Sequence, residues 1–176
     1  MTVAFISCNP EKMSLFEGSK GNKKYQSFRE QQLQILQSLI HAGCTDFISG
    51  THMAFEIRIA EDILTLQKEN KSITLECVVP FPEHWDHWSQ ADQNRRYKVI
   101  THANTSVMLS DHYCENWYSI YNRYMIDKAD VVVFAFSGHM GELPCTVNYA
   151  QKQNKIVIQI DPTTAQIKIL NPRTFD

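Results

Sequence analysis

The sequence predicts an α/β protein with a doubly wound, mostly parallel sheet and helices on both faces. Segments with strand and helix character alternate along the chain, and the strand segments are continuous apolar runs. Such runs are typical of parallel strands that are buried on both faces. The right-handed crossovers that join parallel strands then place helices on both sides of the sheet.

The predicted strands are short and rich in β-branched and aromatic residues, as buried strands usually are. They span residues 2–7, 45–50, 72–81, 104–110, 130–136 and 155–161, with a further edge strand at 166–170.

The predicted helices have apolar residues at three- and four-residue spacings. They span residues 25–43, 53–70, 91–103, 115–129 and 143–154. In the first helix the expected apolar stripe is Phe28, Leu33, Leu36, Leu39 and Ile40. Gly43 is its expected C-cap. Residues 11–24 hold two glycines and several lysines and are expected to form an exposed loop.

Length and charge limit the classes of protein. With 176 residues the chain is expected to form a single domain over residues 1–176. Hydrophobic residues make up 43% and charged residues 20%, which is ordinary for a globular protein. The net charge of −2 argues against a strongly electrostatic nucleic-acid binder, which would carry a basic domain.

The cysteines and the apolar segments bear on the compartment. Five cysteines with no CxxC pair are typical of reduced thiols rather than of a disulfide framework. The first residues show no basic segment followed by a long apolar stretch. No apolar run approaches the roughly 20 residues that span a bilayer. We therefore expect a cytoplasmic protein without a membrane partner.

Two glycine loops each join a predicted strand to a predicted helix. Gly50 lies in FISGTHMAFE, and Gly138 and Gly141 lie in FAFSGHMGELPCT. A helix N-terminus attracts anions such as phosphate, and glycine lets the backbone approach closely. Neither loop has the GxGxxG or GxxxxGK[ST] pattern. The spacing alone therefore leaves two interpretations, an ordinary turn or a phosphate loop.

Two charged residues also have two interpretations. Arg123 is either a solvated helix residue held by Asp127 at i+4, or an arginine that binds a phosphate or carboxylate. Glu56 is expected in the first turn of a helix, where the dipole favours a carboxylate. It is also a candidate for binding a ribose hydroxyl.

The segment HWDHW has the residue types of a metal or aromatic site. His84, Asp86 and His87 do not supply the three or four ligands in defined spacing that zinc requires, and no cofactor is indicated. Trp85 and Trp88 follow a strand end, where they either wall a pocket or close the core. A Cys–His enzyme is not indicated either, because nothing in the sequence pairs a cysteine with a histidine base.

Several segments match a known family in order and spacing. They are TVAFISCNP, KYQ, FISGTHMAFEIRIAE, VVPF followed by a tryptophan, RRYKVI, NRYMIDKADVVVFAF and GHMGELPCTVNYA. Over nearly the whole chain they resemble the YpsA-like family of the SLOG superfamily, which includes DprA-like and LOG (lysine-decarboxylase-like) proteins. The resemblance implies a Rossmann-like fold that binds nucleotides or nucleotide-derived ligands at the two glycine loops.

The resemblance also implies a set of site residues. Ligand-binding roles are expected for Gly50, Thr51, Glu56, Phe81, Trp85, Asn122, Arg123, Asp127, Gly138, Gly141, Glu142 and Thr146. Phe81 or Trp85 would cover a base, and Arg123 would pair with a phosphate.

The chain departs from the family pattern at both loops. Ala54 stands where a second glycine is common, and Glu56 replaces an aspartate. The second loop reads GEL instead of GGT, so Glu142 places a negative charge where a phosphate would sit. The glutamate of the LOG signature falls near Cys145, which puts hydrolysis by the LOG scheme in doubt.

The expected function is therefore binding or sensing of a nucleotide-derived small molecule. One alternative is an N-glycosidic hydrolase of LOG type, with Glu56 or Glu142 as the acid/base residue. The other is single-stranded DNA binding as in DprA-like proteins, for which NKK at 22–24 and RR at 95–96 provide little basic charge. Association into a homo-oligomer is compatible with the resemblance.

Overall fold

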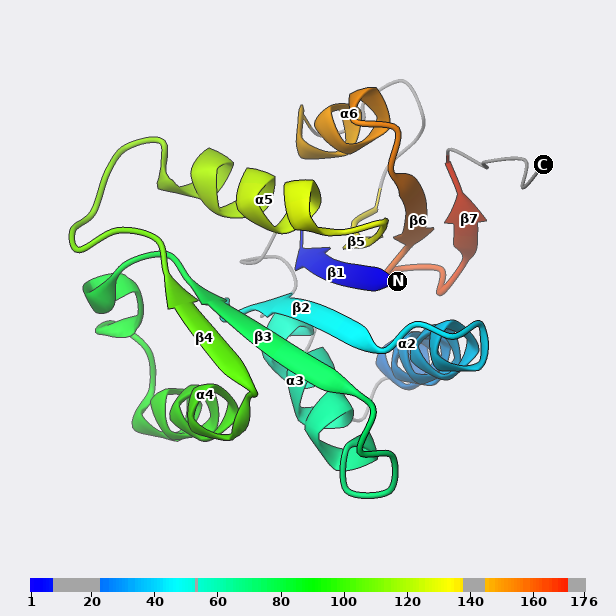
Figure 1. The fold of residues 1–176 in the computed structure, drawn as a ribbon, viewed down its shortest axis with the longest axis horizontal. Helices are drawn as coiled ribbons and strands as arrows, with labels where there is room; N and C mark the ends of the chain where they lie inside the picture. The colour runs from blue at the N-terminus through cyan, green and yellow to red at the C-terminus, as the bar shows by residue number, and fades with distance from the viewer. Residues whose placement is uncertain (8–22, 53, 138–144, 171–176) are drawn as a thin grey trace.

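The computed structural model describes residues 1–7, 23–52, 54–137 and 145–170 (Figure 1). The strands are β1 (Thr2–Ser7), β2 (Asp46–Gly50), β3 (Thr74–Val79), β4 (Thr105–Met108), β5 (Val131–Ala135), β6 (Ile156–Ile160) and β7 (Ile167–Ile169). The helices are α2 (Lys23–His41), α3 (Phe55–Leu66), α4 (Gln90–His102), α5 (Trp117–Lys128) and α6 (Cys145–Lys152), with a 3-10 turn η1 (Pro82–Trp85).

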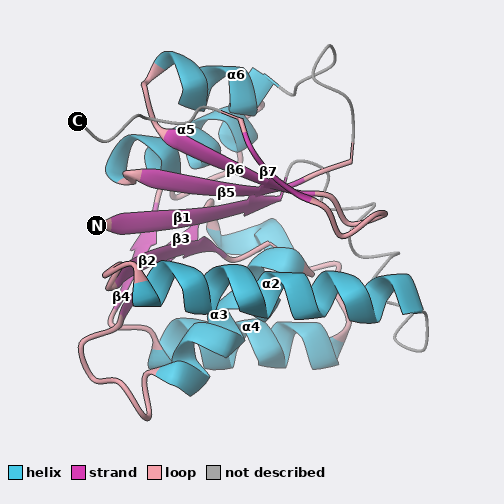
Figure 2. Ribbon diagram, turned by 90° about the vertical axis from the view of Figure 1, so that its right-hand side faces the viewer, coloured by secondary structure: helices cyan, strands magenta, loops and turns pink. Residues whose placement is uncertain are grey.

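The strands form one seven-stranded sheet in the order β4-β3-β2-β1-β5-β6-β7. All neighbours are parallel except β7, which pairs antiparallel with β6 at the edge. Figure 2 shows α2, α3 and α4 on one face of the sheet and α5 and α6 on the other. The predicted fold class, a Rossmann-like doubly wound sheet, is confirmed.

Two apolar cores lie on the two faces, and alternation along the strands divides residues between them. In β1, Val3 and Phe5 belong to the core beneath α2 and α3, whereas Ala4 and Ile6 belong to the core beneath α5 and α6. Both sets are buried, which explains why the strand reads as a continuous apolar run.

The first helix differs from its prediction in two respects. It begins at Lys23, so Lys23 and Lys24, which were expected in an exposed loop, are helical, and lysine is a good helix former. The remaining predicted loop residues, 11–22, lie outside the described residues. Leu33 is 37% exposed, and Gln32 and Ile35 are buried instead. The buried stripe therefore includes a polar side chain, which an apolar pattern does not reveal.

The helix ends as predicted. Gly43 has φ +86°, and the N–H of Cys44 returns to the carbonyl of Leu39 at 3.0 Å. Strand β3 stops before Pro80, which has no N–H to contribute to a ladder.

Candidate functional site

The winding of the sheet reverses at β1. Strands β2, β3 and β4 lie on one side of it, and β5, β6 and β7 lie on the other. Open α/β sheets bind ligands beyond the carboxyl ends of their strands at such a switch point. The Tyr118 hydroxyl in the first turn of α5 donates to the carbonyl of Ser7, at the end of β1, at 2.6 Å. The beginning of α5 therefore lies at this edge.

The carboxylate of Glu56 joins several elements at the same edge. It is 1% exposed and accepts the backbone N–H groups of Ser7 at 3.0 Å and His52 at 3.1 Å. The Tyr121 hydroxyl donates to the same carboxylate at 2.7 Å and accepts the N–H of Thr51 at 2.7 Å. Burial raises the pKa of Glu56, and these hydrogen bonds act in the opposite direction. The network ties the ends of β1 and β2 to α5.

Gly50 is required by this network. A Cβ at position 50 would overlap the Tyr121 hydroxyl oxygen and the Glu56 carboxylate. Neither group can move freely, because both are buried and hydrogen-bonded. The reason for glycine here is steric, as expected, but the atoms it admits belong to the protein itself.

A cavity of about 300 Å³ lies between α5 and α6. It is lined by Tyr118, Ser119, Asn122, Arg123, Ile126, Cys145, Thr146 and Tyr149. Three residues predicted from the sequence, Asn122, Arg123 and Thr146, thus line one cavity. Its α5 residues include the first turn of that helix, so the cavity reaches the carboxyl edge of the sheet.

Asn122 is the most unusual residue of this cavity. It is 1% exposed, and among the described residues neither its side-chain oxygen nor its nitrogen has a hydrogen-bond partner. A buried amide without partners costs about 1–3 kcal/mol for each unsatisfied group. Such a group in a cavity wall is suited to a ligand that offers both a donor and an acceptor.

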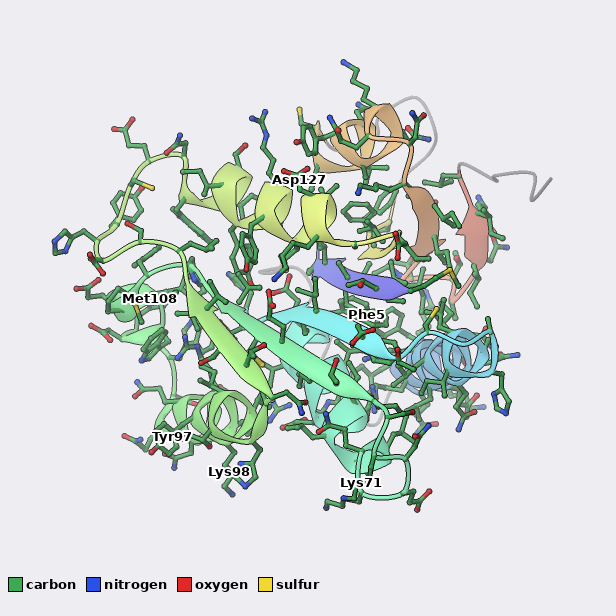
Figure 3. The ribbon with its side chains drawn as sticks, in the orientation of Figure 1. Phe5, Lys71, Tyr97, Lys98, Met108 and Asp127 are labelled. Atoms are coloured by element: carbon green, nitrogen blue, oxygen red, sulfur yellow. The ribbon has the colours of Figure 1, made fainter. Side chains whose placement is uncertain are left out.

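Arg123 and Asp127 both interact with Tyr149 across the gap between the helices. The guanidinium carbon of Arg123 lies 4.9 Å from the centroid of the Tyr149 ring. The Tyr149 hydroxyl donates to Asp127 at 2.9 Å, and Figure 3 shows Asp127 on the side of α5 that faces α6. Within the described residues no ion pair joins Arg123 to Asp127, so the i+4 pair allowed by the sequence is not formed.

The aromatic residues after β3 lie on the other side of the edge. Phe81 is buried against His84 and Trp117, with ring centroids 5.4 and 5.6 Å away. Trp88 is also buried and closes the core. Trp85 is half-buried and stacks on the protein's own arginine, with the guanidinium carbon of Arg96 3.1 Å from a ring centroid.

The predicted residues thus fall into three groups. Gly50, Thr51 and Glu56 share the network at the end of β2, whereas Phe81 and Trp85 pack beside η1. The α5–α6 cavity collects Asn122, Arg123 and Thr146, with Asp127 bound to one of its lining residues. Gly138, Gly141 and Glu142 lie outside the described residues.

Sequence reasoning missed Tyr121, Tyr149 and Arg96. The two tyrosines lie in predicted helices, at positions where an aromatic residue is normally interpreted as part of the apolar core. Arg96 was noted only as part of the RRYKVI match and of the RR pair considered for DNA binding, and its neighbour Arg95 is a half-buried partner of Glu61. No local signal distinguishes a buried arginine from an exposed one beside it.

The described residues contain no metal-ligand cluster of three or more histidine, cysteine, aspartate or glutamate side chains. Across the same residues, no helix has the length and apolar character needed to cross a membrane.

Fold and site together define a doubly wound α/β protein with a cavity between α5 and α6. Comparison with known families assigns it more closely. A model described as the YspA SLOG family (YpsA) matches residues 9–166, which is more than half of the chain. The chain therefore belongs to this SLOG family, as its motifs predicted. No curated protein matches it.

Proposed function

We propose that this protein binds a nucleotide-derived small molecule at the carboxyl edge of its sheet, with the α5–α6 cavity as part of the site. The observation that carries the proposal is the Asn122 amide, which is buried in a cavity wall beside Arg123 and has no partner among the residues described. Membership of a SLOG family supports a nucleotide-related ligand. The location at the switch point supports a ligand site at this edge.

Each lining group has a proposed part in recognition. Arg123 pairs with an anionic group such as a phosphate, for which a guanidinium fork is suited. Asn122 hydrogen-bonds the base edge or a ribose hydroxyl through its donor and its acceptor. Thr146, in the first turn of α6, offers a hydroxyl to the same ligand.

Binding is favoured over hydrolysis for a chemical reason. Loss of a base from a ribose requires a carboxylate near the anomeric carbon. Among the described residues that line the cavity there is no aspartate or glutamate. The Glu56 carboxylate has three donors of its own and is almost fully buried.

Thermal unfolding in the presence of AMP, ADP, ADP-ribose, NAD and cyclic nucleotides tests the proposal. A ligand at 100 times its Kd stabilises by about 2.7 kcal/mol, which raises the Tm by roughly 5–11 °C at this size. We expect at least one compound to produce this shift, and Arg123→Gln to abolish it. Lys152→Gln, an exposed substitution in the last turn of α6, is the matched control and keeps the shift.

Asn122→Leu separates binding from folding. Replacing an unpartnered buried amide by an apolar group of similar size is expected to leave stability unchanged or higher, while the ligand shift is lost. No shift with any compound, or a full shift in both Arg123→Gln and Asn122→Leu, would contradict the proposal.

A further inference from the structure

Three nitrogen-bearing side chains lie in the same region beyond the ends of β2 and β3, on the η1 and α4 side of the edge. His52 follows β2, His84 lies in η1, and Arg96 lies in the second turn of α4. The rings of His52 and His84 are 4.9 Å apart between centroids. The Arg96 guanidinium covers Trp85 and reaches the Thr51 hydroxyl at 3.5 Å, which is long for a hydrogen bond.

Each of the three has a buried nitrogen that finds no partner within the described part of the chain. These atoms are Nδ1 of His52, Nδ1 of His84 and Nε of Arg96. His84 is 6% exposed and Arg96 is 4% exposed. Burying a guanidinium without a carboxylate or a full set of acceptors is strongly unfavourable, and proteins usually pair such a charge.

The charges around the cluster are of one sign. His84 is influenced by His52, Arg96 and His87, and His52 by His87. Arg96 is influenced by Tyr121 and Cys77, which are neutral in their ordinary forms. Within the described residues, no aspartate or glutamate acts on any of the three, and Glu56 is bonded elsewhere.

Burial has the expected effect on these groups. It lowers the pKa of His52 to about 4 and that of His84 to about 3, with neighbouring positive charge acting in the same direction. It also lowers the pKa of Arg96 to about 9. Near neutral pH the cluster therefore holds one buried positive charge, that of Arg96, beside two neutral imidazoles, and an anion would stabilise this charge.

We propose that His52, His84 and Arg96 form an anion-binding subsite for a phosphate group, either as the free ion or as part of a phosphorylated small molecule. The Nε of Arg96, together with Nη2, which reaches the Thr51 hydroxyl only at 3.5 Å, provides a fork for two phosphate oxygens. The imidazoles supply further donors, and Trp85 and Trp117 provide aromatic walls. The half-buried Trp85 and His52 are where the subsite meets solvent.

This subsite is separate from the α5–α6 cavity, and the inference does not depend on the function proposed there. The cavity is lined by residues of α5 and α6, whereas the subsite uses η1, α4 and the residues after β2. Helix α5 lies between them, with Trp117 packed on His84 and Asn122 in the cavity wall. A ligand with two anionic groups is therefore one way to occupy both.

Binding of an anion is expected to be linked to protonation. An anion beside the two imidazoles favours their charged forms, so the bound state takes up protons that the free protein does not hold near neutral pH. Affinity should rise as the pH falls, by up to about tenfold per pH unit for each histidine that takes up a proton. The other titratable groups that face the imidazoles are His87 and Arg96.

Tryptophan fluorescence reports on this subsite directly. The chain has three tryptophans, and Trp85, Trp88 and Trp117 all contact the cluster. We would titrate the full chain with sodium sulfate at constant ionic strength between pH 8 and pH 5.5, with chloride as the reference. Sulfate is a tetrahedral analogue of phosphate, and its charge stays constant in this range. Inorganic phosphate and pyrophosphate follow at pH 7.

A saturable sulfate signal that strengthens at low pH is the expected result, and Arg96→Gln should lose it. The matched control is the neighbouring Arg95→Gln, which removes a surface partner of Glu61 and should keep the signal. His84→Gln should retain part of the affinity and lose much of the pH dependence. Arg123→Gln should keep the signal, which separates this test from that of the cavity.

Several outcomes would overturn the inference. One is the absence of any saturable response to sulfate, phosphate or pyrophosphate. Another is an unchanged response in Arg96→Gln. Arg96→Met distinguishes a binding role from a purely structural one. If Arg96 serves to bind an anion, the Arg96→Met variant folds with a Tm equal to or above that of the parent chain. A large loss of stability in Arg96→Met, without an anion response in the parent chain, would assign Arg96 to the core alone.

Discussion

Two buried polar regions lie side by side at the carboxyl edge of this sheet, and they differ in how their groups are satisfied. Around Glu56, the carboxylate oxygens and the neighbouring N–H groups are paired, with distances of 2.7–3.1 Å. Around Arg96, one nitrogen of the arginine and one of each of two histidines have no partner in the ranges that the structure describes. The first region includes the Tyr121 hydroxyl, which donates to Glu56, and in the second region Arg96 reaches the Thr51 hydroxyl.

The difference indicates what each region does. A satisfied buried network lowers the free energy of the folded chain and fixes the positions of its elements. An unsatisfied region costs free energy in the folded chain and is suited to a group that arrives from outside. The Glu56 network is thus expected to govern stability, and the Arg96 cluster to respond to pH and anions.

The largest expected effect is at Gly50. Gly50→Ala forces a methyl group into the Tyr121 hydroxyl and the Glu56 carboxylate, and we expect a loss of about 3–5 kcal/mol in the free energy of unfolding. Gly43→Ala is the matched control: it has no neighbour within 4 Å and only a positive φ to oppose it, so it should cost about 1 kcal/mol. Urea unfolding of both variants checks this, and equal losses would contradict the steric account.

Removing the Tyr121 hydroxyl tests the same network from α5. Tyr121→Phe leaves the Thr51 N–H buried without a partner and takes one donor from Glu56, for an expected loss of about 2–3 kcal/mol. Tyr124→Phe also removes a hydroxyl that donates to a glutamate, but Glu76 keeps its ion pair with Lys128. That control should cost less than about 1 kcal/mol by the same urea measurement. A similar cost in both variants would contradict the prediction that the Tyr121 hydroxyl contributes more to stability than the Tyr124 hydroxyl.

The Arg96 cluster, through His84, is expected to make the stability of the protein depend on pH. His84 has a folded pKa of about 3, below its unfolded value, so the unfolded chain binds more protons between about pH 6.5 and 3. Stability is therefore lost as the pH falls through this window, by about 2 kcal/mol between pH 7 and pH 5 from His84. His84→Gln should remove that part of the slope.

The raised pKa of Glu56 acts in the opposite direction, because its folded form holds a proton more readily than its unfolded form. The comparison must therefore be the difference between the His84→Gln variant and the parent chain, measured by urea unfolding at pH 5, 6 and 7. Parallel curves for the two proteins would contradict the prediction.

The smallest expected effect is at Ala54, beside the network. Ala54 has φ +65° and ψ −104°, a conformation that suits glycine. Ala54→Gly is expected to stabilise the protein by about 1 kcal/mol. Ala60→Gly, in the middle of α3, should destabilise it by about 2 kcal/mol, because glycine is a poor helix former and a buried methyl group is also lost. If both substitutions destabilise the chain in thermal unfolding, the backbone at position 54 is not strained.

The family pattern helps to interpret this position. A glycine is common there in the resemblance noted from the sequence, and the positive φ supplies a physical reason for it. Ala54 is therefore a departure that the fold tolerates at a cost.

The sequence by itself determined the fold class, the order of the elements and the family. These follow from short-range patterns: continuous apolar runs such as β5, helical spacing such as that of α3, and short motifs in a fixed order. Such patterns can be recognised without knowing which distant residues are in contact, because periodicity and chain order are properties of the sequence itself.

Only the tertiary structure decided which polar residues are satisfied. The partners of Glu56 come from positions 7, 52 and 121, and the pairing of Trp85 with Arg96 joins η1 to α4. The sequence could not distinguish buried Arg96 from Arg95, or show that Asn122 lacks partners, because burial and pairing depend on long-range packing. The proposals of ligand sites rest on these groups.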